Sequence, residues 1–435
     1  MLTTEAVLAL APDDASAKAA RGLVSPAKWP LRGADASAVW GECQGSGSKP
    51  YQTQVDLAGP AFRCTCPSRK FPCKHGLALL LMKVQDGAAF SGGPPPSWVA
   101  EWLASRLDKS QKQEARAAAV AEAAPDPEGT AKREAQRWQR IESAGVDLSR
   151  WLADQLAQGL GALNPTAVGA WQTMAARLVD ARAPGLAQRV REAAAGISDP
   201  PERTLARLAM LQLACDGLAR RLTLPASEQA DLRTLLGWPL ERADVLARGT
   251  PVADRWCVLA VALDEREPRL TERRVWLHGP SCGRRALLLD HAYAGKGFEQ
   301  SWVTGIAVDA ALVFYPSAAP LRALCDVPAG AGIATLPDAD DEWRRIAERM
   351  AANPFVPLHP MLWRDAVLLH EDGWLAVAGG RALPMAVEST DAWALQARSG
   401  GRPVHLAGEW DGRRFAPLAA WASSGTPPVW QRGVP

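Results

Sequence analysis

The spacing of apolar residues changes along the chain and divides it into regions of different structure. Near the N-terminus, alternation over residues 38–43 and 51–57 predicts two strands joined through the turn-rich segment 44–50. A helical repeat follows at Leu77, Leu80, Leu81 and Val84, spaced i, i+3, i+4 and i+7. With short helices expected over residues 4–10 and from Asp13, residues 1–86 predict a small ββα-type unit.

The next two regions are helical in pattern. Residues 87–130 combine a Pro/Gly-rich linker with an alanine-rich helix-prone stretch. Residues 131–250 predict a helical domain, in which Asp147 is expected to cap a helix that carries Leu148 and Trp151. A second helix is indicated by its apolar stripe, Leu205, Leu208, Cys215, Leu218 and Leu222.

From residue 251 the helical period gives way to short β-forming runs. Residues 256–263, 274–278 and 374–378 are rich in β-formers and separated by Gly/Pro turns. One helix is expected over residues 342–350. The sequence therefore predicts an α+β multidomain protein whose C-terminal domain, residues 251–435, is β-rich.

Composition narrows the class of protein. The 435 residues are 48% hydrophobic and 22% charged, which is typical of a folded chain. The formal net charge is +2, so any strongly basic surface would be confined to one part of the molecule. Eight cysteines are too few for a disulfide framework at this length. We expect no signal peptide, because no basic, apolar N-terminal segment is present. No membrane span is expected either, so a reducing, cytoplasmic location follows.

One cluster carries specific chemistry. Residues 64–75 read C-x-C-x6-C-x-H and place three thiols and an imidazole within a short segment, at Cys64, Cys66, Cys73 and His75. Cys3His is a usual ligand set for a structural Zn²⁺ ion. Two cysteines at i and i+2 on an extended segment project to the same side. Pro72 is suited to open the following helix, whose first turn then holds Cys73 and His75.

Other interpretations of the four residues are weaker. Reduced core cysteines without a metal would not require this spacing, and redox chemistry is disfavoured because no C-x-x-C is present. Four protein ligands leave no open coordination position, so a structural zinc is favoured over a catalytic one.

The motif, with a hairpin before it and an apolar helix after it, resembles the SWIM zinc finger over residues 38–84. That family occurs in bacterial and archaeal proteins, chromatin-remodelling ATPases, Mutator-class transposases and plant transcription regulators. It is expected to bind DNA or proteins rather than to catalyse. The chain is similar to bacterial members with an N-terminal finger and a long C-terminal extension. Some of their genes lie beside those for MoxR-type AAA+ ATPases and von Willebrand A-domain proteins, which the resemblance implies as partners.

Basic residues surround the predicted zinc ligands. No acidic residue lies between positions 61 and 83, where the basic residues are Arg63, Arg69, Lys70, Lys74 and Lys83. Part of this charge offsets the site, since Zn²⁺ with three thiolates carries a net −1. The remainder is either an ordinary solvated face or a set of phosphate contacts, for which Arg63, Arg69, Lys70 and Lys74 are the candidates.

Weaker signals lie in the C-terminal region. Residues 279–283 match G-x-S-x-G, which would make Ser281 a hydrolase nucleophile if a strand–turn–helix surrounded it. His278, Cys282 and His291 could be imagined as a second metal site, but isolated histidines near strand ends are usually structural. The acidic run Asp338, Asp340, Asp341 and Glu342 is explained more simply as the capped start of a helix.

The leading hypothesis is a zinc-binding, non-enzymatic interaction or scaffold protein that works in a larger assembly. Nucleic-acid binding through the basic finger is the alternative, and a serine hydrolase using Ser281 is the third.

Overall fold

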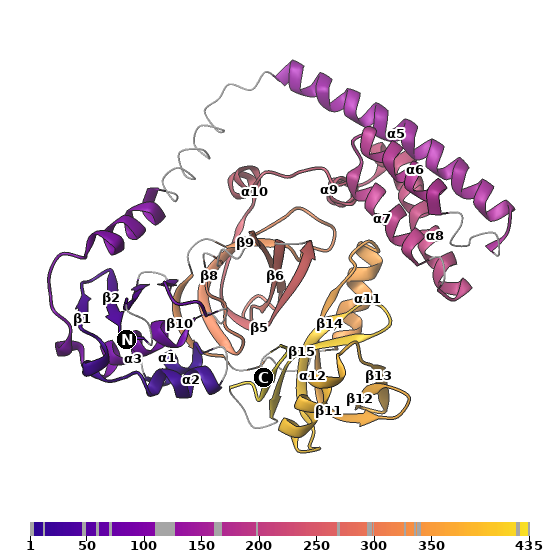
Figure 1. The fold of residues 1–435 in the computed structure, drawn as a ribbon. Coiled ribbons are helices and arrows are strands. Elements are labelled where there is room, and N and C mark those ends of the chain that lie inside the picture. Colours follow the sequence, from indigo (N-terminus) through magenta and orange to yellow (C-terminus); the bar gives the residue numbers. More distant parts are fainter. Residues whose placement is uncertain are drawn as a thin grey trace.

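The structure is a computed structural model with three parts, in which the C-terminal sheets lie between the N-terminal unit and a helical bundle (Figure 1). The described residues are 4–11, 14–45, 49–57, 61–68, 72–108, 127–160, 168–196, 199–267, 270–293, 298, 300–325, 328–334, 336, 341–422 and 427–433. None of the described helices combines the length and the apolar character needed to cross a bilayer.

The N-terminal part is a four-stranded antiparallel sheet backed by helices. Its strands lie in chain order: β1 (Leu31–Ala34), β2 (Ala38–Cys43), β3 (Tyr51–Asp56) and β4 (Ala61–Cys64). The predicted hairpin is therefore present as β2–β3, and β1 was not foreseen. Three helices form the layer that covers one face of this sheet: α1 (Thr4–Ala9), α2 (Asp14–Arg21) and α3 (Lys74–Gln85). Leu77, Leu80 and Leu81 of α3 are buried against the sheet, as their spacing predicted.

A further helix covers the opposite face of this sheet. Residues 97–108 are helical, and Val99 packs with Trp40 and Ala38 of β2 in a separate small core. Arg106 forms an ion pair with Asp56 of β3 at 3.1 Å. Just before this helix, Ser91 pairs with Gly33 at the β1 edge. Both faces of the N-terminal sheet are thus covered by segments of the same chain.

The middle of the chain is a helical bundle, joined to a short helix that leads into the sheets. Its helices are α5 (Pro127–Ala157), α6 (Val168–Asp180), α7 (Pro184–Ala195), α8 (Pro201–Ala219) and α9 (Ala226–Leu235), and α10 (Arg242–Arg248) follows. Asp147 caps no helix: α5 runs through it without a break, and the prediction of an N-cap there was wrong. Ile141 and Leu148 lie two turns apart on the buried face of α5. Asp147 is exposed, so an aspartate inside the helix at this position costs little stability.

The apolar stripe predicted on α8 is only partly buried. Leu208, Cys215 and Leu218 belong to the bundle core. Leu205 and Leu222 are exposed, and Leu222 lies beyond the end of α8. The bundle core therefore contacts α8 from Leu208 to Leu218, near its C-terminal end.

The C-terminal part consists of two antiparallel sheets, as the change to short β-forming runs predicted. The first contains β5 (Pro251–Glu267), β6 (Leu270–His278), β7 (Arg285–Tyr293), β8 (Ile306–Phe314), β9 (Ala323–Cys325) and β10 (Ala329–Ile333). The second contains β11 (His359–His370), β12 (Trp374–Ala378), β13 (Arg381–Pro384), β14 (Val404–Trp410), β15 (Phe415–Ala422) and β16 (Trp430–Gln431).

Two helices accompany these sheets, α11 (Glu342–Ala352) and α12 (Ser389–Ser399). The sequence predicted the first and missed the second. Gly400, in the left-handed conformation at φ 61°, terminates α12, and Ala392 and Leu395 bury its inner face. The apolar residues of α12 are mostly small alanines, so the hydrophobic periodicity of this segment was too weak to predict a helix.

The first sheet curls until its edges meet. The order β10-β8-β5-β6-β7 is supplemented by β9, which pairs with β8, and the Leu287 N–H donates to the Leu321 carbonyl beside β9. One apolar core, around Trp256 and Leu277, belongs to this sheet. A second core, with Trp276 and Trp421, lies between the two sheets.

A buried ion pair joins the two sheets. Arg274 of β6 donates from Nε and Nη2 to the two carboxylate oxygens of Glu409 of β14, at 2.7 and 3.0 Å. The indole of Trp276 donates to the same carboxylate at 2.7 Å. Because all three side chains are buried, this contact fixes how the sheets face each other.

The three parts contact one another directly. The N-terminal core packs against Val303, and α1 contacts β10. On the bundle side, the Asp231 carboxylate of α9 accepts a hydrogen bond from the Ala318 N–H at 2.8 Å. Arg189 of α7 donates to the Phe355 carbonyl at 2.9 Å. The N-terminal unit and the bundle are therefore both docked on the C-terminal sheets.

Candidate metal centre

Cys64, Cys66, Cys73 and His75 converge in the structure. Their ligand atoms all lie within 4.8 Å of one another, and Sγ of Cys64 is 3.8 Å from Nδ1 of His75. Zn–S bonds of about 2.3 Å in a tetrahedron require sulfur atoms about 3.8 Å apart. Three thiols and one imidazole at this separation fit one tetrahedral Zn²⁺ ion, as the sequence predicted.

Two elements deliver the ligands. Cys64 is the last residue of β4, and Cys66 lies two positions later in a bend beyond the strand, whereas the sequence predicted one extended segment for both. Cys73 is the N-cap of α3 and His75 its second residue. Pro72 therefore precedes the helix and does not open it, because the first helical residue is Lys74, two positions later. The helix N-terminus still faces the thiolates, where its positive end favours them.

The neighbouring strand supplies support that the sequence did not reveal. Thr53 of β3 is opposite Cys64 in the strand register, and its Oγ1 lies 3.2 Å from the Cys64 sulfur. With Cys64 as a thiolate, the threonine hydroxyl is the donor. The ring of Tyr51 lies against the His75 imidazole with centroids 5.0 Å apart. These two side chains hold one ligand from each half of the motif.

Gly76 allows α3 to approach β4 closely. A Cβ atom at this position would lie 2.8 Å from Cδ1 of Phe62, a distance that side chains do not tolerate. Gly76 directly follows His75, so any larger residue would push the imidazole away from Cys64. The glycine therefore sets the spacing between the two halves of the site.

The electrostatics of the group favour a cation. Hydrogen bonds from the Cys64 and Cys73 thiols lower the pKa of Cys66. Burial by itself lowers the pKa of His75, but hydrogen bonding and attraction to Cys64 and Cys66 outweigh it and raise this pKa to about 9. The sulfur cluster thus attracts positive charge, which Zn²⁺ supplies with the imidazole neutral.

Cys43 lies near the cluster without joining it. It is buried at the end of β2, where burial, with a contribution from the neighbouring Cys64, raises the pKa of its thiol to about 11. It belongs to the apolar core and is not among the converging ligand atoms. Cys215, Cys257 and Cys325 are likewise buried in cores, as predicted.

Residues 51–84 match the family model of the SWIM zinc finger. The chain carries a SWIM zinc finger. A second match identifies residues 136–236 as a SWIM-associated four-helix bundle domain, which covers most of α5 and the helices through α9. No curated protein and no solved structure matches the chain. The SWIM finger therefore lies N-terminal to its associated bundle and to a long C-terminal extension.

Two of the four basic residues predicted to contact nucleic acid lie in the part of the chain that the structure describes. Arg63 on β4, next to Cys64, and Lys74 at the start of α3, between Cys73 and His75, are exposed. Arg69 and Lys70 lie outside the described residues. Lys83, at the other end of α3, lies 5.5 Å from the Phe90 ring centroid in a cation–π contact.

The structure places Ser281 in a β-hairpin. It lies in the turn between β6 and β7, and no helix follows it, so the strand–turn–helix of a nucleophile elbow is absent at this position. The Asp254 carboxylate accepts hydrogen bonds from the backbone N–H groups of Ser281 and Cys282. This aspartate stabilises the turn.

The remaining candidate clusters have structural explanations. Among the described residues, the SWIM ligands are the one group of three or more His, Cys, Asp or Glu that could hold a metal, so His278, Cys282 and His291 do not form a second site. Asp341 caps α11 by accepting from the Arg344 N–H at 3.1 Å, as predicted. Asp338 and Asp340 lie outside the described residues.

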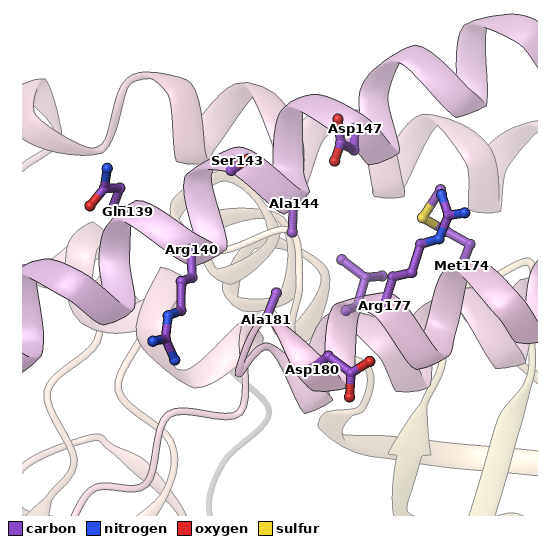
Figure 2. Close-up of a pocket in the computed structure, with 10 residues that line it drawn as sticks. Gln139, Arg140, Ser143, Ala144, Asp147, Met174, Arg177, Asp180 and Ala181 are labelled. Carbon is purple, nitrogen blue, oxygen red and sulfur yellow. The ribbon is translucent and has the colours of Figure 1, made fainter.

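The bundle carries a groove that the sequence did not suggest. It has a volume of about 670 Å³ and lies between α5 and α6 (Figure 2). Arg140 and Asp147 line it from α5, and Arg177 and Asp180 line it from α6. The basic and acidic side chains balance, so its charge does not favour one kind of ligand.

Proposed function

We propose that the protein is a zinc-dependent interaction module that assembles with a protein partner and does not catalyse a reaction. The observation that carries this proposal is the closed ligand set of the SWIM finger. Three cysteines and one histidine fill a tetrahedron, which leaves no position for a substrate or an activated water. The metal then stabilises a recognition surface, contributing on the order of 10 kcal/mol to its folding.

The packing of the finger indicates which part of it would meet a partner. Residues 97–108 cover one face of its sheet, and α3 with α1 covers the other. At the zinc-binding end, Arg63, Thr65, Pro67, Ser68 and Lys74 are exposed. We infer that this end, together with the outer edge of β4, is the recognition surface.

The C-terminal sheets and the bundle would act as the scaffold. Both the finger and the bundle contact the sheets, through Val303 on one side and Ala318 on the other. By resemblance to bacterial SWIM proteins, MoxR-type AAA+ ATPases and von Willebrand A-domain proteins are the candidate partners, in the cytoplasm. Reduced thiolate ligands agree with that location.

Nucleic-acid binding is the second candidate, and the exposed Arg63 and Lys74 beside the zinc ligands favour it. With Arg69 and Lys70 in the same motif, these residues would contact phosphates. The near-neutral charge of the whole chain favours the protein partner instead, because a dedicated nucleic-acid binder usually carries a larger basic surface.

Affinity purification of the full zinc-loaded chain, with and without nuclease, separates the two proposals. A protein partner stays bound after nuclease treatment and is lost from the Arg63→Glu/Lys74→Glu variant. Loss of every bound protein on nuclease treatment, with binding of purified DNA or RNA that falls steeply with salt, would support the second function and overturn the first. Arg344→Glu, at an exposed position on α11, is the matched control.

A further inference from the structure

Trp393 of α12 is the most exposed tryptophan of the chain. Its side chain has a relative exposure of 56%, whereas every other tryptophan is buried or half-buried. Covering an indole removes a large apolar area from water, and tryptophan is enriched among the residues that dominate the affinity of protein interfaces. The exposed indole of Trp393 is therefore a candidate contact for another molecule.

Two further rings hold the Trp393 indole in place. Trp374, at the start of β12, packs against it edge to face, with ring centroids 4.9 Å apart and an angle of 85° between the planes. His370 lies opposite Trp374 in the β11–β12 register, and its exposed ring contacts Trp374 at 4.7 Å and Trp393 at 5.7 Å. Trp374 is only 8% exposed and belongs to the core of the second sheet. The core thus supports the Trp393 ring from inside, and the rest of the ring faces solvent.

Elsewhere the chain covers its indoles with its own arginines. Three such cation–π pairs are Arg137 with Trp238, Arg221 with Trp138 and Arg381 with Trp343, at 3.8, 4.5 and 5.4 Å from the ring centroids. In the part of the chain that the structure describes, no lysine or arginine makes this contact with Trp393. Trp393 therefore has the ring face that an arginine covers at other positions, without a cation from its own chain.

The segments that carry the three rings are acidic. Residues 369–376 and 385–397 contain four carboxylates and no lysine or arginine, the carboxylates being those of Glu371, Asp372, Glu388 and Asp391. Glu388 and Asp391 lie at the start of α12, where part of their charge offsets the positive end of the helix. Glu371 and Asp372 have no such role. They are exposed in the turn between His370 and Trp374, and neither forms an ion pair with another described residue.

We propose that Trp393, together with Glu371 and Asp372, binds an arginine side chain from a basic segment of a partner protein. The guanidinium plane stacks on the exposed indole, and its N–H groups donate to the carboxylates of the turn. Arginine suits this arrangement better than lysine, because a planar guanidinium stacks on a ring while its edge stays free to donate. The occupant then makes the contact that the chain's own arginines make at its other indoles.

This surface is separate from the zinc-binding end of the finger. It is formed by β11, β12 and α12 of the second sheet, whereas the recognition surface proposed above is formed by β4 and the start of α3. The proposal does not depend on the function assigned to the finger, because no zinc ligand and no basic residue of the finger takes part.

Isothermal titration of the full zinc-loaded chain with a tetra-arginine peptide tests the site, with the uncharged tetra-citrulline peptide as the matched probe. We expect saturable binding of the arginine peptide and none of the citrulline peptide. Trp393→Leu, which keeps an apolar side chain over Trp374, should weaken binding at least about fivefold through loss of the cation–π contact. Tyr293→Leu removes an exposed aromatic ring from β7 and should leave the affinity unchanged.

A pair of charge variants keeps the test independent of any folding defect in Trp393→Leu. Glu371→Gln/Asp372→Asn changes only exposed side chains of the turn and should weaken binding at least about threefold. Glu202→Gln/Glu348→Gln removes the same charge from exposed positions elsewhere and should have no effect. Absence of arginine-peptide binding to the wild type would overturn the proposal. Equal affinities of wild type and Trp393→Leu, or equal losses in the two double variants, would also overturn it.

Discussion

Thr53 and Cys64 face each other across the β3–β4 pair, with the threonine Oγ1 3.2 Å from the cysteine sulfur. The hydroxyl is buried and comes from a strand that supplies no metal ligand. It stabilises the thiolate form of Cys64 and fixes the direction of its sulfur. The SWIM site is therefore built from the sheet as well as from the motif that carries the ligands.

Thr53→Val is expected to weaken zinc binding about tenfold, because the isosteric side chain cannot donate to the thiolate. Competition with a chromogenic chelator measures the change. Thr234→Val, which removes a hydroxyl from the surface of α9, is the control and should leave the affinity as it is. Equal affinities for Thr53→Val and the wild type would show that the hydroxyl does not support Cys64.

Acidification is expected to destabilise the C-terminal sheets through His359. Burial and the nearby Arg349 lower its pKa to about 4, whereas the unfolded chain has the ordinary value of 6.5. The unfolded state thus binds the proton first, and stability is lost as pH falls from 6.5 toward 4. The loss is about 2 kcal/mol by pH 5.

Urea denaturation of wild type and His359→Gln at pH 7 and pH 5 measures this contribution. The variant should lose about 2 kcal/mol less than the wild type between the two pH values. Any acid sensitivity of the zinc site is common to both proteins and cancels. The same pH dependence in both would contradict a neutral, buried His359.

Glu409→Leu is expected to cost about 1–3 kcal/mol, because it leaves the buried Trp276 indole and two donors of Arg274 without their shared acceptor, while Asp264 and Glu272 still pair with Arg274. Denaturant unfolding measures the cost. Glu348→Leu, at an exposed site on α11, should change stability by less than about 0.5 kcal/mol. A cost for Glu409→Leu as small as for the control would mean that the ion pair does not join the sheets.

Val99→Asp is expected to detach the helix of residues 97–108 from the finger, since it places a charge against Trp40 in a closed apolar contact. Hydrogen exchange should then show reduced protection in this helix, while zinc stays bound. Ser105→Asp changes an exposed position of the same helix and should leave exchange unchanged. Full protection in Val99→Asp would argue against the packing of this helix on the sheet.

The zinc ligands were predictable because they lie close together in the sequence, where strand and helix geometry alone bring them into range. Thr53 was not, because its position depends on the register of β3 against β4. Gly76 was also missed: its importance comes from the distance to Phe62, which only the packed helix reveals.

Longer-range features escaped the sequence for a related reason. Arg285 and Glu342 would each be expected at the surface, and only the docking of α11 on the first sheet buries them together. Asp147 resembled a helix cap, but the apolar positions on either side of it kept α5 continuous. Local patterns predicted the elements well, while the contacts between elements required the fold.

The metal content of the purified chain, measured by elemental analysis alongside native mass spectrometry, tests the central claim most directly. One zinc per chain is predicted for the wild type and for Cys43→Ala, whose buried thiol lies near the cluster outside the ligand set. Cys66→Ala should lose the metal. Zinc retained in full by Cys66→Ala, or absent from the wild type, would contradict the account.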